Sequence, residues 1–558
     1  MNERTVAGLH IIQAALLVGV VGDMLFGQAG GLGINLGLWT LTLAGVAWWL
    51  DHASGSKTLS TLACRWLLPS ALFFAALVAW RASGVLRALD LLIVVMLLAF
   101  VGAESQSGRT TLPFAGILST ASEAARSVCR TLTGFVPLVF RDVRWREMSS
   151  GRWSRHARGV ARALAIALPL IIVFGTLFMA ADAVFRSLVN NAFAVDTGSL
   201  FSHLIVALCL TWLAGGFLRN VFLARTLPAP NVAGVGQVVA TGDAALNANA
   251  TSNVNLTGAT ATATGANVPA VLREPFRLGT LETVIVLGLL NALFAMFVSV
   301  QLRYLFGGAE WVATTSGVTL AEYARGGFFE LVTVAALVLP LLLGWHALLR
   351  APNAKSTKTF RVLASLLVML LCVIMVSAVS RMMLYTDEYG LTQLRFYTTA
   401  FMAWLGLALL WFAATVLVRD ARREFLPGAL ISLLVVTFAL HIANPDALIV
   451  RVNANRVRAE RVFDTEYALS LSDDAVPALI ESLTNASALT SYERGSIARE
   501  LVGRDAAYAA TDWRAWSVSR AQARRAIAAK GEGLWKLATM HVNETERMDA
   551  MEGVTVGE

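Results

Sequence analysis

The stretch LASLLVMLLCVIMVSAVSRMML, residues 363–384, has one charged side chain, Arg381, in 22 positions. An α-helix rises about 1.5 Å per residue, so roughly 20 apolar residues cross a hydrocarbon core about 30 Å thick. Residues 204–223 and 284–302 have the same length and character. These segments predict transmembrane helices.

Eleven such stretches predict an all-α fold, a polytopic transmembrane helix bundle of about 11 spans with a small C-terminal helical domain. We expect the spans at residues 9–27, 32–50, 62–81, 84–103, 160–182, 200–223, 279–302, 328–349, 361–384, 394–418 and 427–443.

Composition excludes a soluble globular protein. Mean hydropathy is +0.63, apolar residues make up 56% and charged residues only 15%, against about 25% charged residues in soluble domains. The four cysteines are scattered without a CxxC pair, so we expect neither structural disulfides nor a cysteine zinc site. No metal site and no cofactor is predicted.

The distribution of basic residues predicts the topology. Alternate loops, counted together with the adjoining span ends, carry 24 and 7 Lys/Arg residues, and the basic side of a membrane protein faces the cytoplasm. We therefore expect a cytoplasmic N-terminus, an extracytoplasmic C-terminal domain and a place in the bacterial cytoplasmic (inner) membrane. Basic stripes interleaved with aromatics are missing, so nucleic acid is not an expected partner.

Four regions follow from these patterns. Residues 1–225 form a six-span N-terminal half with a basic cytoplasmic loop at 104–159, and residues 276–443 form a five-span half. Between them, 226–275 is a low-complexity insert that we expect to be disordered, because it lacks the large apolar side chains needed for a core. Residues 444–558 form the extracytoplasmic α-helical domain.

The basic loop contains a short apolar run, Leu132–Phe140, interrupted by Pro137. It is too short to span and predicts an interfacial or re-entrant helix. The flanking arginines predict binding of anionic lipid head groups, although charge that merely sets topology is an equal alternative: Arg130, Arg141, Arg144 and Arg146.

Acidic residues inside apolar helices are costly and mark functional sites. Asp23 and Asp90 lie about four to six residues from a predicted helix end and Asp182 lies at the end of its predicted span, all in the same leaflet as Arg381. They can bind a cation, take up a proton or pair with arginine. We expect at least two of them to share a polar site with Arg381.

The C-terminal domain reads as helices. Thr490 and Glu493 have capping-box spacing. Trp513, Trp516 and Arg520 are spaced i, i+3 and i+7, which predicts one face of a helix and a candidate surface for a partner.

Three stretches resemble a widespread bacterial family of multi-pass membrane proteins catalogued only as a domain of unknown function. They are residues 301–308 with 321–331; Leu384-Tyr385 with Tyr389-Gly-Leu-Thr392 and Arg395; and Asp464-x-x-Tyr467 with residues 471–479. The resemblance covers about 276–525 and implies a bacterial cytoplasmic-membrane protein. It carries over no catalytic residue.

The first of these stretches predicts an outer loop between two spans. Its polar and aromatic residues form either an interfacial anchor or a site for a ligand outside the membrane: Tyr304, Glu322, Tyr323, Arg325 and Glu330.

No G-x-S-x-G, H-E-x-x-H or P-loop motif occurs, so hydrolase, protease and ATPase functions lose their usual support. No catalytic residue is predicted, and an enzyme with dispersed residues is the third choice. We expect a sensing or partner-binding membrane protein whose outer helical domain recruits a protein or an envelope ligand. The alternative is a transporter of a small solute, ion or lipid that uses the outer-leaflet carboxylates.

Overall fold

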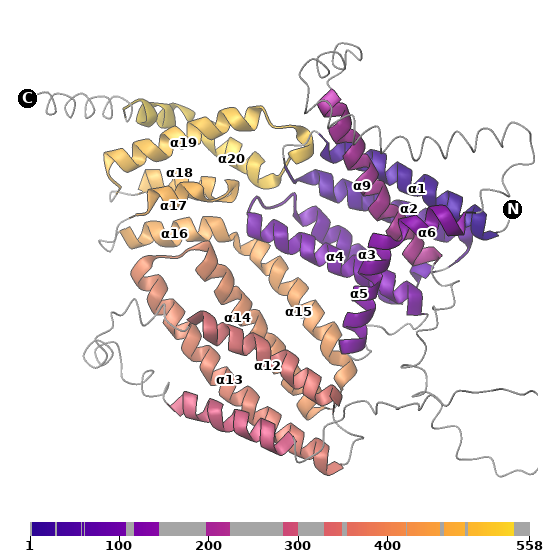
Figure 1. The fold of residues 1–558 in the computed structure, drawn as a ribbon. Helices are drawn as coiled ribbons and strands as arrows, with labels where there is room; N and C mark the ends of the chain where they lie inside the picture. Colours follow the sequence, from indigo (N-terminus) through magenta and orange to yellow (C-terminus); the bar gives the residue numbers. More distant parts are fainter. Residues whose placement is uncertain are drawn as a thin grey trace, which may run out of the picture.

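In a computed structural model of the chain, the structure describes residues 3–27, 31–56, 58–60, 62–107, 117–143, 197–223, 283–299, 328–348, 354–419, 421–457, 463–485 and 489–540. Every regular element within these ranges is helical (Figure 1). The predicted all-α class is confirmed. The predicted span 160–182 and the insert 226–275 lie outside the described residues.

The N-terminal part is a bundle of long apolar helices. It contains α1 (Glu3–Phe26), α2 (Ile34–Ser54), α3 (Leu62–Leu77), α4 (Gly84–Ser107) and α9 (Thr197–Phe222). Between the last two lie α5 (Ile117–Thr133), the short α6 (Phe135–Pro137) and the π-helical turn η3 (Leu138–Asp142). The 3₁₀ turn η1 (Thr58–Ser60) precedes α3.

The second group of membrane helices follows the insert. It contains the helix Thr283–Ser299, α12 (Phe328–Leu348), α13 (Ala354–Tyr389), α14 (Gln393–Phe412) with its π-helical continuation η5 (Ala413–Val418), and α15 (Arg422–Ala443). Six described helices are long and apolar enough to cross a membrane: α1, α4, α9, α13, α14 with η5, and α15. The chain is therefore a polytopic membrane protein, and its span count of eleven stays a prediction.

The tail is a compact set of short helices at one end of the membrane bundle (Figure 1). Its elements are α16 (Pro445–Val457), α17 (Thr465–Ser470), η6 (Asp473–Ala475), α18 (Val476–Asn485), α19 (Ser491–Ala509), η7 (Trp513–Ala515), α20 (Val518–Ala529) and a last helix at 531–540. The predicted capping box is confirmed, because Thr490 and Glu493 exchange both bonds at the start of α19.

The described apolar side chains form three buried clusters. One joins α1–α4 and α9, the second joins Thr283–Ser299 with α12–α15, and the third fills the tail. Helix α15 connects the first two, since Phe425 packs in the second cluster and Leu430 in the first. The two groups of membrane helices thus share one helix.

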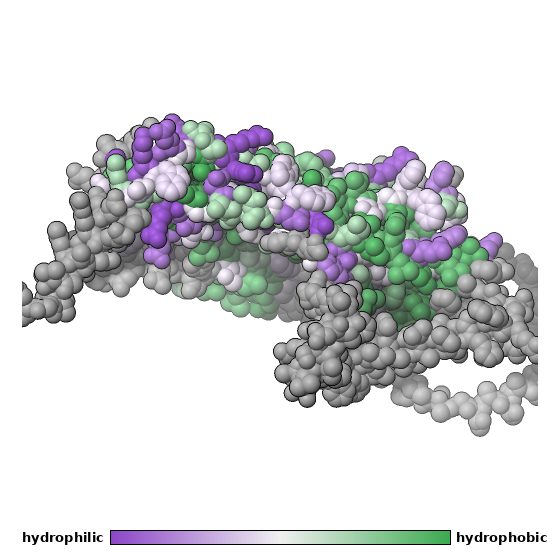
Figure 2. Space-filling view, turned by 90° about the horizontal axis from the view of Figure 1, so that it is seen from above, coloured by the Kyte–Doolittle hydropathy of each residue, from purple (hydrophilic) through white to green (hydrophobic). Residues whose placement is uncertain are grey.

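Many apolar side chains of the membrane helices face outward, as a protein surrounded by lipid requires. On α1, Leu17 is 54% exposed and Met24 is 63% exposed. Figure 2 shows purple and pale side chains over the tail at the left, with broader green areas over the membrane helices toward the right.

Candidate functional site at the junction of tail and membrane helices

A single carboxylate of the tail holds the turn between α3 and α4. The Asp474 Oδ2 atom accepts hydrogen bonds from the backbone N–H groups of Ala82 (2.6 Å) and Ser83 (3.0 Å). Its Oδ1 atom accepts from the Ser519 hydroxyl. Ser472 caps η6 and fixes Asp474 in place. Because α4 begins at Gly84, this negative charge lies against the positive end of the α4 dipole.

Arg81 connects this carboxylate to the last membrane helix. Its Nη1 atom lies 3.2 Å from Asp474 Oδ1, and its Nε atom donates to the His441 backbone carbonyl at 2.7 Å. The guanidinium also lies 5.2 Å from the centre of the Trp80 ring. Arg81 is only 7% exposed, so the α3–α4 turn, the end of α15 and the tail meet at one buried cation.

Backbone hydrogen bonds extend the contact between the tail and the first group of helices. The N–H groups of Val518 and Ser519 donate to the carbonyls of Ala79 (2.8 Å) and Trp80 (3.2 Å). The Ile34 N–H, at the start of α2, donates to the Trp516 carbonyl at 3.1 Å. The start of α20 is therefore bonded to the α3–α4 turn, and Trp516, two residues before α20, is bonded to the start of α2.

The tail is also bonded to the turn between α13 and α14. The Gln393 backbone N–H donates to the Tyr467 hydroxyl at 2.7 Å, and its side chain donates to Asp446 at 2.9 Å. The Asn453 side chain accepts from the Leu391 N–H and donates to the Leu391 carbonyl. Burial raises the pKa of Tyr467, so its hydroxyl stays protonated near neutral pH. The tail thus bridges the two groups of membrane helices.

One predicted carboxylate lies inside this junction. Asp90 Oδ2 is 3.1 Å from Nε2 of His441, and both side chains are fully buried. Tyr397 of α14 reaches the same region, where its hydroxyl is 3.0 Å from the Ser83 hydroxyl. Asp90 therefore joins α4 to α15 through a histidine.

The other residues of the predicted polar membrane site are Asp23, Asp182 and Arg381. Asp23 pairs with His203 of α9 at 3.0 Å, and Asp182 lies outside the described residues. Arg381 is buried in α13 at 9% exposure, but the hydrogen-bond partners of the two described carboxylates are histidines. A shared site with Arg381 stays a prediction.

Of the predicted outer-loop site, Tyr304, Glu322, Tyr323 and Arg325 lie outside the described residues. Glu330 lies in the first turn of α12. No contact within this set is described, and the set stays a prediction.

The predicted single helix face in the tail is wrong. Trp513 lies in the 3₁₀ turn η7, Trp516 follows it, and Arg520 lies in α20. The helix begins only after Ser517, whose side chain caps it by accepting from the Arg520 N–H. Trp513 is 61% exposed, whereas Arg520 turns inward and pairs with Asp473 at 3.3 Å.

A second buried charge cluster lies at the opposite end of the first bundle. Asp142 is bonded to Arg4 of α1 at 2.8 Å and to Arg219 of α9 at 2.6 Å. The apolar run before it is exposed on one side only: Phe140 is 79% exposed, whereas Leu138 is fully buried. Arg130 donates to Gln106 at 3.2 Å, Arg144 and Arg146 lie outside the described residues, and anionic lipid binding stays a prediction.

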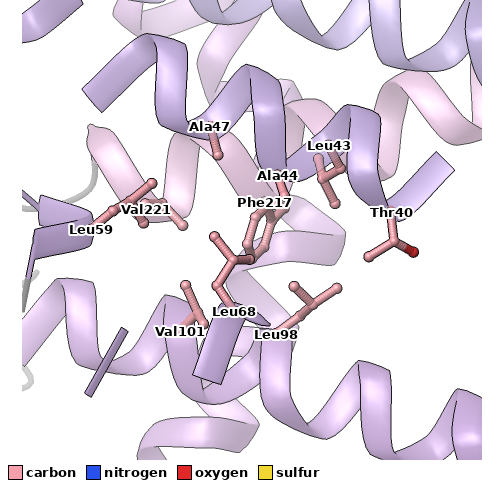
Figure 3. A pocket seen from close by; sticks show the side chains of 10 residues that line it. All are labelled: Thr40, Leu43, Ala44, Ala47, Leu59, Leu68, Leu98, Val101, Phe217 and Val221. Atoms are coloured by element: carbon pink, nitrogen blue, oxygen red, sulfur yellow. The ribbon is translucent and has the colours of Figure 1, made fainter. Parts of the chain in front are cut away.

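Two of the cavities lined by described residues lie within the first bundle. In Figure 3, side chains of α2, α3, α4 and α9 converge around Phe217, and they leave no space for a water molecule. Thr40 at its edge donates to the Leu36 carbonyl of its own helix. The other cavity, of about 400 Å³, has no charged lining residue and is bordered by side chains that include Trp39, Leu98 and Thr131.

The family model described as "Domain of unknown function (DUF4153)" matches residues 68–482, more than half of the chain. The chain belongs to this family. The match begins further toward the N-terminus than the expected resemblance and ends before α19. A search of curated proteins and one of solved structures found no match.

The DUF4153 region contains most of the junction, including Arg81, Asp90, His441 and Asp474, whereas Ser519 lies beyond it. Sequence reasoning selected Asp90 but not its partners. One signal was present, because Asp474 lies within residues 471–479, a stretch that carried the family resemblance.

Proposed function

We propose that this chain is a sensing membrane protein in which the tail receives a signal and passes it to the two groups of membrane helices. The tail would recruit a protein or an envelope ligand outside the bacterial cytoplasmic membrane. The N-terminus of the chain would lie in the cytoplasm, because the side with 24 basic residues is expected there and the side with 7 outside.

The observation that carries this proposal is the Asp474 carboxylate. It binds two backbone N–H groups and Arg81 at the α3–α4 turn. The same tail binds Leu391 and Gln393 at the α13–α14 turn. A movement of the tail must therefore move both turns or break buried polar bonds, which are costly to leave unmade.

Distance measurements between the two groups of helices test the coupling. Spin labels would replace Ser54 at the end of α2 and Val418 at the end of η5, both exposed. The native exposed cysteines, Cys129 and Cys209, are first changed to serine. These label positions lie at the helix ends opposite the tail.

We expect Asp474→Ala to shift or broaden the distance distribution. Glu532→Gln is the matched control, because Glu532 is 88% exposed in the tail and pairs with Lys536 of the next turn. Identical distributions in the wild type, Asp474→Ala and Glu532→Gln would refute the coupling.

A transporter is the second candidate, and one observation favours it. Asp90 Oδ1 and Arg87 Nη2 are buried and have no hydrogen-bond partner among the described residues. Such groups can line a route for an ion or a proton. Proteoliposomes with an internal pH-sensitive dye and a potassium gradient test this, since a transporter would change internal pH and Asp90→Asn would abolish the change.

A further inference from the structure

The hydrogen bonds of His441 determine how many protons it shares with Asp90. Its Nδ1 atom is 3.0 Å from the Thr437 carbonyl oxygen, one turn earlier in α15. A carbonyl oxygen only accepts, so Nδ1 carries a hydrogen and donates it. The other nitrogen, Nε2, can then either carry a hydrogen or be bare.

Two proton arrangements satisfy the 3.1 Å contact between Nε2 and Asp90 Oδ2. Either Nε2 is bare and accepts from a protonated carboxyl group, or Nε2–H donates to a carboxylate. Both contain one proton more than a neutral imidazole beside a carboxylate. In that last state the Nε2 lone pair faces a negative oxygen, and the bond is lost.

Burial of the pair favours the proton-bound state. Both side chains are fully buried, and the pair is neutral when it holds its proton. The charged groups beside it are Arg87, whose positive charge favours the carboxylate, and Arg81, which donates to the His441 carbonyl and is itself paired with Asp474. Loss of the proton leaves a charged carboxylate in a fully buried site and breaks its hydrogen bond to His441, which is unfavourable.

The same pair is connected to the tail through one residue. The His441 backbone carbonyl accepts from Arg81, whose guanidinium pairs with Asp474. A displacement of His441 relative to α4 therefore acts on the bond that holds the tail.

We propose that Asp90 and His441 form a binding site for one proton and that occupancy of this site keeps the tail docked. The ligand is the proton itself, taken up from the compartment on the tail side. This inference rests on the proposed function only for its second part, the effect on the tail.

Hydrogen exchange of the full chain in nanodiscs, followed by mass spectrometry across pH, measures tail docking. The reporters are the Ala82 and Ser83 amides, which donate to Asp474. Protection is expressed relative to the unfolded chain at each pH. Because one proton is bound in the docked state and lost on release, protection falls by up to tenfold per pH unit on the alkaline side.

Asp90→Asn provides the decisive variant. Its amide donates to a bare Nε2 and imitates the proton-bound pair, so protection becomes independent of pH. Asp23→Asn is the matched control, since it alters the other described Asp–His pair, and it should follow the wild type. A wild type and an Asp90→Asn variant with the same pH dependence would overturn the proposal.

Spectroscopy of the wild type keeps the test independent of how the variants fold. Infrared and ¹⁵N-histidine signals should show either a protonated carboxyl group or an imidazolium that disappears at alkaline pH. The absence of both overturns the proton site, whatever the distance measurements give. Proton binding without any change in protection overturns its effect on docking and counts against the proposed sensing function, while the proton site stands.

Discussion

At the scale of single residues, Asp474 is the side chain whose removal should lower the free energy of unfolding most. Asp474→Ala leaves Arg81 buried without its acidic partner, and breaking a buried ion pair costs about 3 kcal/mol or more. We expect faster proteolysis of the tail and a lower unfolding midpoint in denaturant. Adding Arg81→Leu should restore part of the loss, because the orphaned charge is then gone.

The exposed acid Glu532 provides the comparison for that measurement. Its replacement should change stability by no more than about 0.5 kcal/mol. Equal effects of Asp474→Ala and Glu532→Ala would mean that the buried network contributes nothing to docking.

Tyr508 of α19 makes the stability of the tail depend on pH in the alkaline range. Burial, and then the Asp473 carboxylate that accepts from the Tyr508 hydroxyl at 2.6 Å, raise the pKa of Tyr508. A raised pKa means that the folded tail prefers the neutral phenol. The contribution of Tyr508 to the free energy of unfolding is complete below the pKa of the unfolded chain, about 10. It is lost as pH rises through the pKa of the folded tail.

We therefore expect the tail to lose stability above about pH 10. Tyr508→Phe should weaken it by about 1 kcal/mol at neutral pH through the lost hydrogen bond and should flatten the alkaline loss. Denaturant titrations at pH 7 and at high pH measure both effects. An unchanged alkaline slope in Tyr508→Phe would assign the loss to other groups.

At the scale of elements, glycines allow α5 to lie directly against α9. A Cβ atom at Gly216 would overlap the carbonyl oxygen of Thr131 in α5, and one at Gly215 would meet the Phe135 ring. Small residues at such crossings let helix backbones approach closely in membranes.

Gly216→Ala should therefore push α5 away and destabilise the bundle by about 1–3 kcal/mol. Gly45→Ala is the control, because a Cβ there meets nothing within 4 Å. Thermal unfolding of both variants in the same detergent compares them. A Gly216→Ala protein as stable as Gly45→Ala would show that the contact is not tight.

The length of the apolar stretches predicted these membrane helices because each helix is determined by its own residues. The expected span 200–223 corresponds to α9, Thr197–Phe222, and 84–103 corresponds to α4, Gly84–Ser107. The junction could not be predicted in the same way. Asp474 and Ala82 are 392 positions apart, and no local pattern in either segment identifies the other as its partner.

The histidine partners of Asp90 and Asp23 were missed for a related reason. The sequence pointed to Arg381 as the expected partner of these carboxylates, and no local pattern indicated His203 or His441. The fold instead places each histidine on a neighbouring helix at hydrogen-bond distance. The Trp513–Arg520 spacing misled in the opposite direction, since the Ser517 cap interrupts the expected helix.

At the scale of the whole molecule, the topology can be measured directly. With a cytoplasmic N-terminus and an odd number of spans, the tail lies outside. Alkaline phosphatase fused after Glu558 should be active, because the disulfides of that enzyme form only in an oxidising compartment such as the periplasm. Activity only from a cytoplasmic reporter at the same position would place the tail inside and overturn the count of eleven.

The Asp474 contact also sets an order of assembly during biosynthesis. The N–H groups before α4 receive their acceptor from a residue 392 positions later. At about 5–20 residues per second, the ribosome needs roughly 20–80 s to reach it. Helix α4 is therefore synthesised before the acceptor of these N–H groups exists. The hydrogen bonds to Asp474 can form only after the tail has been translated. A truncated product would keep an open, protease-sensitive turn, which gives the cell a physical mark of unfinished synthesis.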